Sequence, residues 1–462
     1  MDGRWYAFGG RLVVSLGVLT GALTGAATFL VADSAVAIRS VEQPGIAVEA
    51  THVPSLLTVA GDRAELNYDA YCIDPQAESP EDSCALVGSV FIRPGSTGQF
   101  RELPLRSEGG VNHLVASVPA EILSSRKGFT YYAHIQDAAG RAFITLPAGG
   151  ASAPHRSLPL EATIDVDLGR HVFERVLRAD ERVADAGWGD GPTDVALEEG
   201  RNLSPTGASS FDVDPSGAVV LLDQAHRRVL RWRSGSRAPT RIPLAIAGTL
   251  ADVSLAPDGS IYVLEPANNT RNTPLIRRFD SYGRELESTE AAERTASQIR
   301  QGPLGPVVLE QPSDQWMPVA SGGSPVPPEL QRRRGRSGRP LQGGGEIVVL
   351  RRANEIRVAL VDQARVRRSW RITSETALAE VQLAELLGQH VVIVVRVYTE
   401  DADEFEVLVL GAEGLLGRAS LDAADWAETA PLGRFRLTGG SLYQLGSTFA
   451  GAFIDRFDLE VR

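Results

Sequence analysis

The chain has 462 residues, of which 43% are hydrophobic, so it can form more than one apolar core. Its formal net charge of −12 excludes a general nucleic-acid binder, which needs a basic surface to neutralise phosphates. The sequence lacks the motifs of zinc proteases, P-loop nucleotide hydrolases and α/β-hydrolases, and we therefore expect no cofactor and no metal.

The N-terminal segment predicts export. Residues 12–32 carry no charge, and Arg4 and Arg11 precede them. The stretch that ends at Ala37 supplies the small residues that signal peptidase accepts, which favours a cleaved signal peptide over residues 1–37. The alternative is an uncleaved membrane anchor, because the apolar stretch is just long enough to span a bilayer. Both interpretations place the remainder outside the cytoplasm, either extracellular or held at the membrane.

Residues 42–150 have the pattern of a β-sandwich, with short strands separated by turn residues. The predicted strands are at 56–61, 64–72, 86–95, 99–105, 112–119, 129–137 and 141–147. Alternation is clearest in the strand 129–137. One face of that strand is expected to carry Phe129, Tyr131, Ala133 and Ile135.

This segment resembles the bacterial immunoglobulin-like or fibronectin-III-like domains. Their last hairpin carries a tyrosine, an aspartate and a glycine at the positions of Tyr131, Asp137 and Gly140. The resemblance implies a spacer or interaction module. Cys72 and Cys84 bracket a polar loop, and in an oxidising compartment we expect them to close it with a disulfide. A two-thiol metal site is the less favoured alternative, since no histidine pair accompanies the cysteines.

An internal repeat dominates the remaining residues, 161–462. Residues 211–232 are echoed by 253–279, and the turn glycines Gly217 and Gly259 lie 42 residues apart. In each copy an apolar strand leads into a tight turn, a buried strand and a third strand that ends in an aromatic residue. A period near forty with several short strands per unit is typical of a β-propeller.

Weaker copies of the unit follow, and together they predict six blades, with seven as the alternative. Their strands are at 306–310, 346–350, 356–361, 391–398 and 454–457. Strand 162–169 is expected to join the last blade and close the ring, which removes exposed edges. The polar, Pro-containing stretch 151–160 is predicted to link the sandwich to the propeller. Residues 320–345 are predicted to form a disordered insertion, because they contain few apolar side chains.

The repeat resembles the NHL-repeat and related six-bladed propellers. In these proteins a strand ends in an acid, and the next strand carries arginines and an aromatic end. Asp223, Arg227, Arg228 and Trp232 occupy those positions. The resemblance implies that the acid and the arginines tie neighbouring strands together.

Two turn-rich segments pair tryptophan with carboxylates and are candidate ligand-binding sites. Trp188 and Asp190 precede the first repeat, and Glu310, Asp314 and Trp316 lie at and beyond a later strand. Such pairs are common on sugar-binding and peptide-binding surfaces. The alternative is that both tryptophans pack between blades or against the sandwich.

We therefore expect an exported, non-enzymatic scaffold that binds a protein or glycan partner at the cell envelope through the propeller face. The alternative is a metal-dependent hydrolase or lyase of the gluconolactonase type, with a site in the central tunnel and Glu265 and Glu310 as donors. A purely structural envelope protein is a third interpretation. A calcium site in the acidic turn 400–404 competes with the simpler interpretation of a solvated hairpin tip.

Overall fold

β-Strands form almost all of the regular structure in the described part of this chain. The computed structural model describes residues 45–459 except 60–62, 75–83, 109, 111, 161, 199–203, 248–249, 269–270, 272, 292–294, 304, 311–314, 320–338, 342–344, 353, 363–364 and 429–431. Ile46–Arg462 form one compact unit. The predicted signal peptide or anchor, residues 1–37, lies outside the described part. Within that part, no helix is long and apolar enough to cross a membrane.

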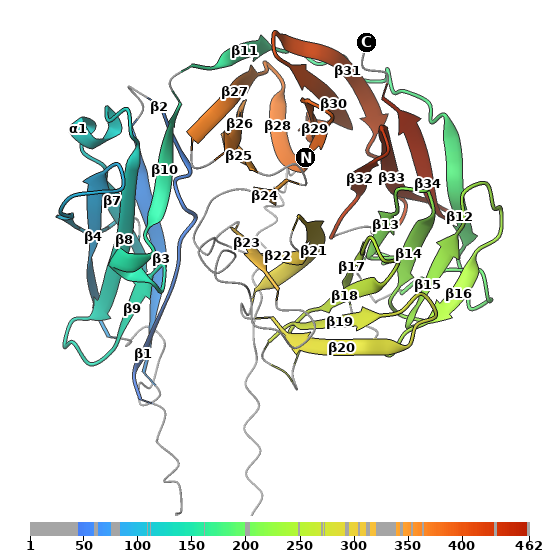
Figure 1. Ribbon diagram of the computed structural model, residues 1–462, viewed down its shortest axis with the longest axis horizontal. Helices are drawn as coiled ribbons and strands as arrows, with labels where there is room; N and C mark the ends of the chain where they lie inside the picture. The colour runs from blue at the N-terminus through green and yellow to red at the C-terminus, as the bar shows by residue number, and fades with distance from the viewer. Residues whose placement is uncertain are drawn as a thin grey trace, which may run out of the picture. The chain divides into compact units, whose positions relative to one another are not determined.

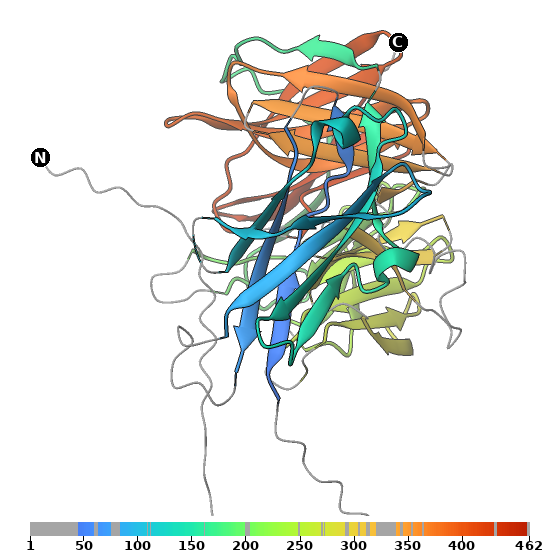
Figure 2. The same ribbon diagram turned by 90° about the vertical axis from the view of Figure 1, so that its left-hand side faces the viewer.

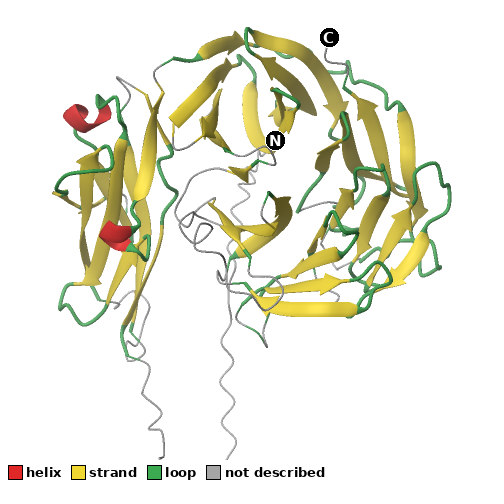
Figure 3. Cartoon of the chain, in the orientation of Figure 1, coloured by secondary structure: helices red, strands yellow, loops and turns green. Residues whose placement is uncertain are grey.

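The N-terminal region folds into two sheets, coloured blue to green in Figures 1 and 2. The first has the order β1 (Ala47–Thr51), β3 (Glu65–Ile73), β7 (His113–Ser117), β6 (Arg106–Ser107). The second has the order β2 (Leu57–Val59), β10 (His155–Leu160), β8 (Phe129–Asp137), β4 (Leu86–Pro94), β5 (Arg101–Pro104), with β9 (Phe143–Leu146) also paired to β8. Helix α1 (Ala120–Leu123) and a 3₁₀ turn (Gly150–Ser152) accompany them (Figure 3).

The two sheets enclose one apolar core, because alternate side chains of each strand point inward. In β3 the side chains of Leu66 and Tyr68 are fully buried, and their neighbours along the strand are exposed. The inward face predicted for 129–137 is confirmed, since all four of its side chains are completely buried. Cys72 and Cys84 form a disulfide, as predicted.

The predicted linker 151–160 is wrong for its second half, because His155–Leu160 form strand β10 inside the second sheet. This strand pairs antiparallel with β8 and parallel with β2. The polar residues of β10 hide the apolar pattern by which a buried strand is predicted from the sequence. In the structure Ser157 is nevertheless fully buried, and its hydroxyl hydrogen-bonds to that of Thr58. Leu158 and Leu160 from β10 then pack against Val348 in the C-terminal region.

The C-terminal region forms six further sheets within the described residues. The first two are β13 (Ser210–Val213), β14 (Val219–Asp223), β15 (Arg228–Trp232), β16 (Thr240–Pro243) and β17 (Asp252–Leu255), β18 (Ile261–Glu265), β19 (Leu275–Phe279), β20 (Glu285–Glu290). The next two are β21 (Ala296–Gly302), β22 (Gly305–Glu310), β23 (Gln315–Pro318) and β24 (Arg339–Pro340), β25 (Glu346–Arg352), β26 (Glu355–Asp362), β27 (Arg365–Thr373). The last two are β28 (Ala377–Leu387), β29 (His390–Tyr398), β30 (Asp403–Gly411), β31 (Gly414–Asp422) and β32 (Phe435–Thr438), β33 (Ser441–Thr448), β34 (Gly451–Asp458). Figure 1 shows these sheets standing radially around a common centre, which is the arrangement of a β-propeller.

Radial stacking follows from the apolar faces of the sheets. Each apolar cluster combines side chains of neighbouring sheets, so no sheet shields its own faces alone. Val220 and Leu222 of β14, for example, share a cluster with Val253 and Ile261 of the following sheet. The predicted repeat is visible here, since the first two sheets have the same strand order.

The ring is closed by a different strand from the one predicted. Segment 162–169 contains β11 (Ile164–Asp167), which pairs in parallel with β27 on the outside of the fourth sheet. The closing strand is β12 (Glu181–Gly187), which pairs antiparallel with β34 of the last sheet. Only two of its side chains, both alanines, are buried, so its alternation is weak in the sequence. At this seam a Cβ atom added to Gly451 would lie 2.1 Å from the carbonyl oxygen of Ala186.

Most of the predicted insertion 320–345 lies outside the described residues. Its described part includes β24, in which Arg339 and Pro340 pair with β25, and Leu341, which is buried in the adjoining core. These three residues belong to the fourth sheet and its core.

Candidate functional site

Trp188 and Asp190 lie in the connection between the closing strand β12 and the first repeat sheet. The indole Nε1 of Trp188 donates to the Thr448 carbonyl oxygen at 3.0 Å, and its ring lies 6.1 Å from that of Trp426. The Asp190 side chain is exposed, with Oδ1 3.1 Å from Nε2 of His226. This pair therefore lies on the first and last sheets, where Trp188 packs against their shared core.

Glu310 and Trp316 lie on the adjacent strands β22 and β23, while Asp314 falls outside the described residues. The Trp316 ring is partly buried, and the guanidinium carbon of Arg339 lies 5.5 Å from its centroid. Of the five predicted residues, Trp316 alone among the described ones lines the large pocket at the centre of the propeller. The structure therefore separates Trp188 and Asp190 from Trp316.

This axial pocket has a volume of about 1580 Å³, which exceeds the usual size of a small-molecule site. Its wall comes from the third to the sixth sheets of the propeller, together with a short segment that follows β1. The apolar side chains of this wall include Leu56, Leu309, Val349, Val381, Leu383 and Phe405.

Strand β28 forms a long side of the axial pocket, since every residue from 379 to 385 lines it. β28 is the edge strand of its sheet, and only β29 pairs with it among the described residues. Most of its side chains are half-buried. The equivalent innermost strand β17 is instead buried at every residue. An edge strand keeps backbone donors and acceptors available for another strand.

Three ion pairs run along the pocket wall. Arg339 pairs with Glu385, Arg396 with Asp403, and Arg434 with Asp425. Both members of each pair line the pocket, so this part of the wall is polar and locally neutral. A wall of this kind suits a ligand with both polar and apolar groups.

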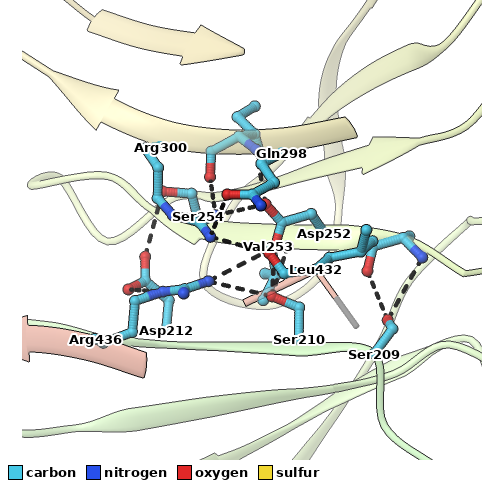
Figure 4. A network of polar contacts seen from close by, with 12 residues as sticks. Ser209, Ser210, Asp212, Asp252, Val253, Ser254, Gln298, Arg300, Leu432 and Arg436 are labelled. Carbon is cyan, nitrogen blue, oxygen red and sulfur yellow. Dashed lines mark hydrogen bonds and ion pairs between the residues drawn. The ribbon is translucent and has the colours of Figure 1, made fainter. Parts of the chain in front are cut away.

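A second polar cluster connects the innermost strands of four sheets (Figure 4). Its centre is Asp252, which is completely buried. One carboxylate oxygen accepts the Ser210 hydroxyl, and the other accepts the backbone N–H of Ile299 at 2.7 Å and a guanidinium N–H of Arg300. Arg436, from the last sheet, places Nη2 3.6 Å from the first oxygen.

Asp212, two residues beyond Ser210 on β13, also connects β13 to β17. It accepts the backbone N–H of Leu255 at 2.7 Å and the hydroxyl of Ser254 at 3.3 Å. Nε of Arg436 lies 3.4 Å from its other oxygen. The two acids thus hold β13 against β17, and the arginines extend the connection to the third and sixth sheets.

None of these four charged residues was predicted from the sequence as part of a site. A signal was present, since Ser210 and Asp252 lie 42 residues apart, as do Asp212 and Ser254. The repeat therefore aligns a hydroxyl with an acid at two alternate positions of the innermost strand. The arginines carry no such signal, because their sheets depart from the repeat.

Three of the acids considered for metal binding, Glu265, Asp403 and Glu404, have other partners. Glu404 accepts hydrogen bonds from His171 and from the Glu174 backbone, and Asp403 pairs with Arg396. Glu265 is buried and accepts the backbone N–H of Ala247 at 2.6 Å. Across the described part of the chain, no three His, Cys, Asp or Glu side chains are grouped so as to hold a metal ion.

No protein family and no curated protein matches the chain at the sequence level. Solved structures are similar only at a distance. Virginiamycin B lyase from Staphylococcus aureus is 10% identical over 55% of this chain and 96% of its own, with a TM-score of 0.32. A streptogramin B lyase is 8% identical over 71% and 90%, with a TM-score of 0.26, and the WD40 repeats of RRP9 are 11% identical over 60% and 100%, with a TM-score of 0.28. The propeller assignment above depends on the sheet order of this chain itself.

Proposed function

We propose that this protein is a non-enzymatic binding protein whose axial pocket takes an extended segment of a partner protein. One observation carries the proposal: the edge strand β28 runs along the pocket with residues 379–385 facing it. An extended peptide can add to such an edge through main-chain hydrogen bonds, and its side chains then enter neighbouring pockets.

A peptide fits this wall better than a glycan. Glycan sites use open aromatic faces, whereas the Trp316 ring is already contacted by Arg339. Much of the remaining wall is aliphatic, with Leu309, Val349 and Leu383 among its members. The acids Glu385 and Asp403 are engaged with arginines, which suits them to shaping the wall rather than to moving protons.

The proposal places the sandwich and the propeller outside the cytoplasm. The Cys72–Cys84 disulfide supports it, because such bonds persist in oxidising compartments. The uncharged stretch 12–32 supports it from the sequence. In this proposal the N-terminal sandwich is an immunoglobulin-like spacer, and the ring is a six-bladed propeller of the NHL-like type whose partner is at the cell envelope.

The test is direct binding of the full chain to arrays of defined ten-residue peptides and of glycans. We expect peptide binding, and we expect Ala379→Trp on β28 to weaken it at least about tenfold by filling the pocket. The matched control is Ala419→Trp on the outer strand β31 of the same sheet, which should bind as the wild type does. Binding of glycans alone, or equal binding by both variants, would overturn the proposal.

A further inference from the structure

Two arginines from distant parts of the chain meet at the axial pocket. Arg300 comes from β21 and Arg436 from β32, and both line the pocket although their side chains are about nine-tenths buried. Figure 4 shows the two guanidinium groups entering the cluster from different strands. The inference below rests on the proposed peptide-binding function and names the group that these arginines recognise.

Gly433 keeps the two guanidinium groups close together. A Cβ atom added to this residue would lie 2.5 Å from Nη1 of Arg436 and 2.7 Å from Nη2 of Arg300. Both groups therefore border the same small volume beside the Gly433 backbone. Any side chain there would displace both, so the glycine preserves a space that two cations share.

The two acids of the cluster match the two arginines in number, but their carboxylate oxygens also accept other donors. Asp252 and Asp212 each accept backbone N–H groups as well as side-chain donors, so their oxygens are shared. Nε of Arg436 is buried without a hydrogen-bond partner, and its contact with Asp212 is 3.4 Å. The pKa of Arg436 is lowered to about 10, chiefly by burial and secondly by repulsion from Arg300. An added anion would relieve that repulsion.

The group that fits is a carboxylate. Guanidinium groups are planar donors that pair with planar carboxylates through two parallel hydrogen bonds. Gln298 adds a side-chain amide next to Arg300, at 3.3 Å, and also lines the pocket. A peptide held along β28 carries such groups at its C-terminus and on its acidic side chains.

We propose that Gln298, Arg300 and Arg436 form a recognition site for a carboxylate group of the peptide bound in the axial pocket.

The first measurement uses the tightest array peptide in three forms: with a free C-terminal carboxylate, with a C-terminal amide, and with its acidic side chains replaced by their amides. We expect at least one neutralised form to bind about tenfold or more weakly. A loss with the C-terminal amide assigns the main-chain carboxylate, and a loss with the amide side chains assigns an acidic residue. Equal binding by all three forms would overturn the inference.

The second measurement does not depend on peptide binding. Sodium acetate is titrated into the full chain at constant ionic strength, with sodium chloride as the balancing salt, and the melting temperature is recorded. Saturable stabilisation by acetate is expected in the wild type. It should be weakened in Arg300→Lys, which keeps the charge but loses the planar fork. The control Arg278→Gln removes a partly exposed arginine that pairs with Asp258 outside the pocket and should respond to acetate as the wild type does.

The two measurements separate the two proposals. Saturable acetate binding without any peptide binding would leave the carboxylate site standing and would reject the peptide-binding function. Peptide binding without an acetate response and without discrimination between acid and amide would do the reverse. Because these comparisons use the wild-type chain, the inference remains testable even where Arg300→Lys does not fold.

Discussion

The hydroxyl of Ser210 donates a hydrogen bond to the carboxylate of Asp252, and the two residues occupy equivalent positions of the repeat, 42 residues apart. Two further hydrogen bonds join equivalent positions with the same separation, from Ser209 to Ala251 and from Ser254 to Asp212. The innermost strands of the first two sheets are thus connected by polar groups that the repeat itself aligns.

Asp252→Asn is expected to destabilise the protein strongly. The substitution leaves Arg300 and Arg436 without their shared buried counter-charge, which costs about 3–5 kcal/mol when one partner of a buried pair is removed. Denaturant unfolding of both proteins at neutral pH measures the change. Asp258→Asn is the control, because Asp258 and Arg278 form a partly exposed pair that contributes at most about 1 kcal/mol. Similar losses for both variants would contradict the prediction.

The sandwich should lose stability in mild acid. Burial lowers the pKa of His52 to about 4 and that of His155 to about 3, and repulsion between the two rings when protonated lowers the pKa of His155 further. Both rings are therefore neutral in the folded state, whereas the unfolded chain takes up protons near pH 6.5. The stabilising contribution is fully present above pH 6.5 and is lost as the pH falls towards these lowered values.

Each buried histidine should cost about 2 kcal/mol of unfolding free energy between pH 7 and pH 5. Denaturant unfolding at both values tests this, and His155→Gln should reduce the difference between them. His113→Gln replaces an exposed ring and is expected to retain the wild-type pH dependence. An unfolding free energy that is equal at pH 7 and pH 5 would count against the prediction.

Removal of the disulfide should also destabilise the sandwich. The bond joins Cys72 to Cys84, 12 residues apart, and closing a loop of this size contributes about 3 kcal/mol in the chain-entropy model. We expect the double variant Cys72→Ser, Cys84→Ser to unfold at lower denaturant concentration, and reduced wild type to behave similarly. A reducing agent should have no effect on the double variant. Identical denaturant midpoints of unfolding for oxidised and reduced wild type would show that the disulfide does not stabilise the protein.

The seam of the ring should be sensitive to one methyl group. Gly451→Ala places a Cβ atom 2.1 Å from the Ala186 carbonyl oxygen, which forces β12 away from β34. Crowding of this kind costs about 1–3 kcal/mol, measurable by thermal or denaturant unfolding. Gly417→Ala is the matched control within a strand, since its nearest neighbours, atoms of Val409, are 3.8 Å away. A tolerated Gly451→Ala would mean that the seam can relax.

Local patterns predicted most of the strands. Alternation identified the inward face of 129–137, and turn glycines with apolar runs identified the strands of the first two propeller sheets. Strand β10 and the closing strand β12 were not predicted, because buried polar residues in the first and small residues in the second give a weak local pattern. Of the candidate site, Trp316 was the predicted residue found at the axial pocket.

The sequence by itself determined the repeat, the strand pattern and the disulfide, because each depends on residues close together along the chain. Only the tertiary structure decided which strand closes the ring and which charges meet at its centre. Arg436 reaches Ser210 across 226 residues, and Arg300 reaches Leu432 across 132. Such contacts depend on how many sheets stand between the two residues and how they turn about the axis, which no local pattern of side chains records.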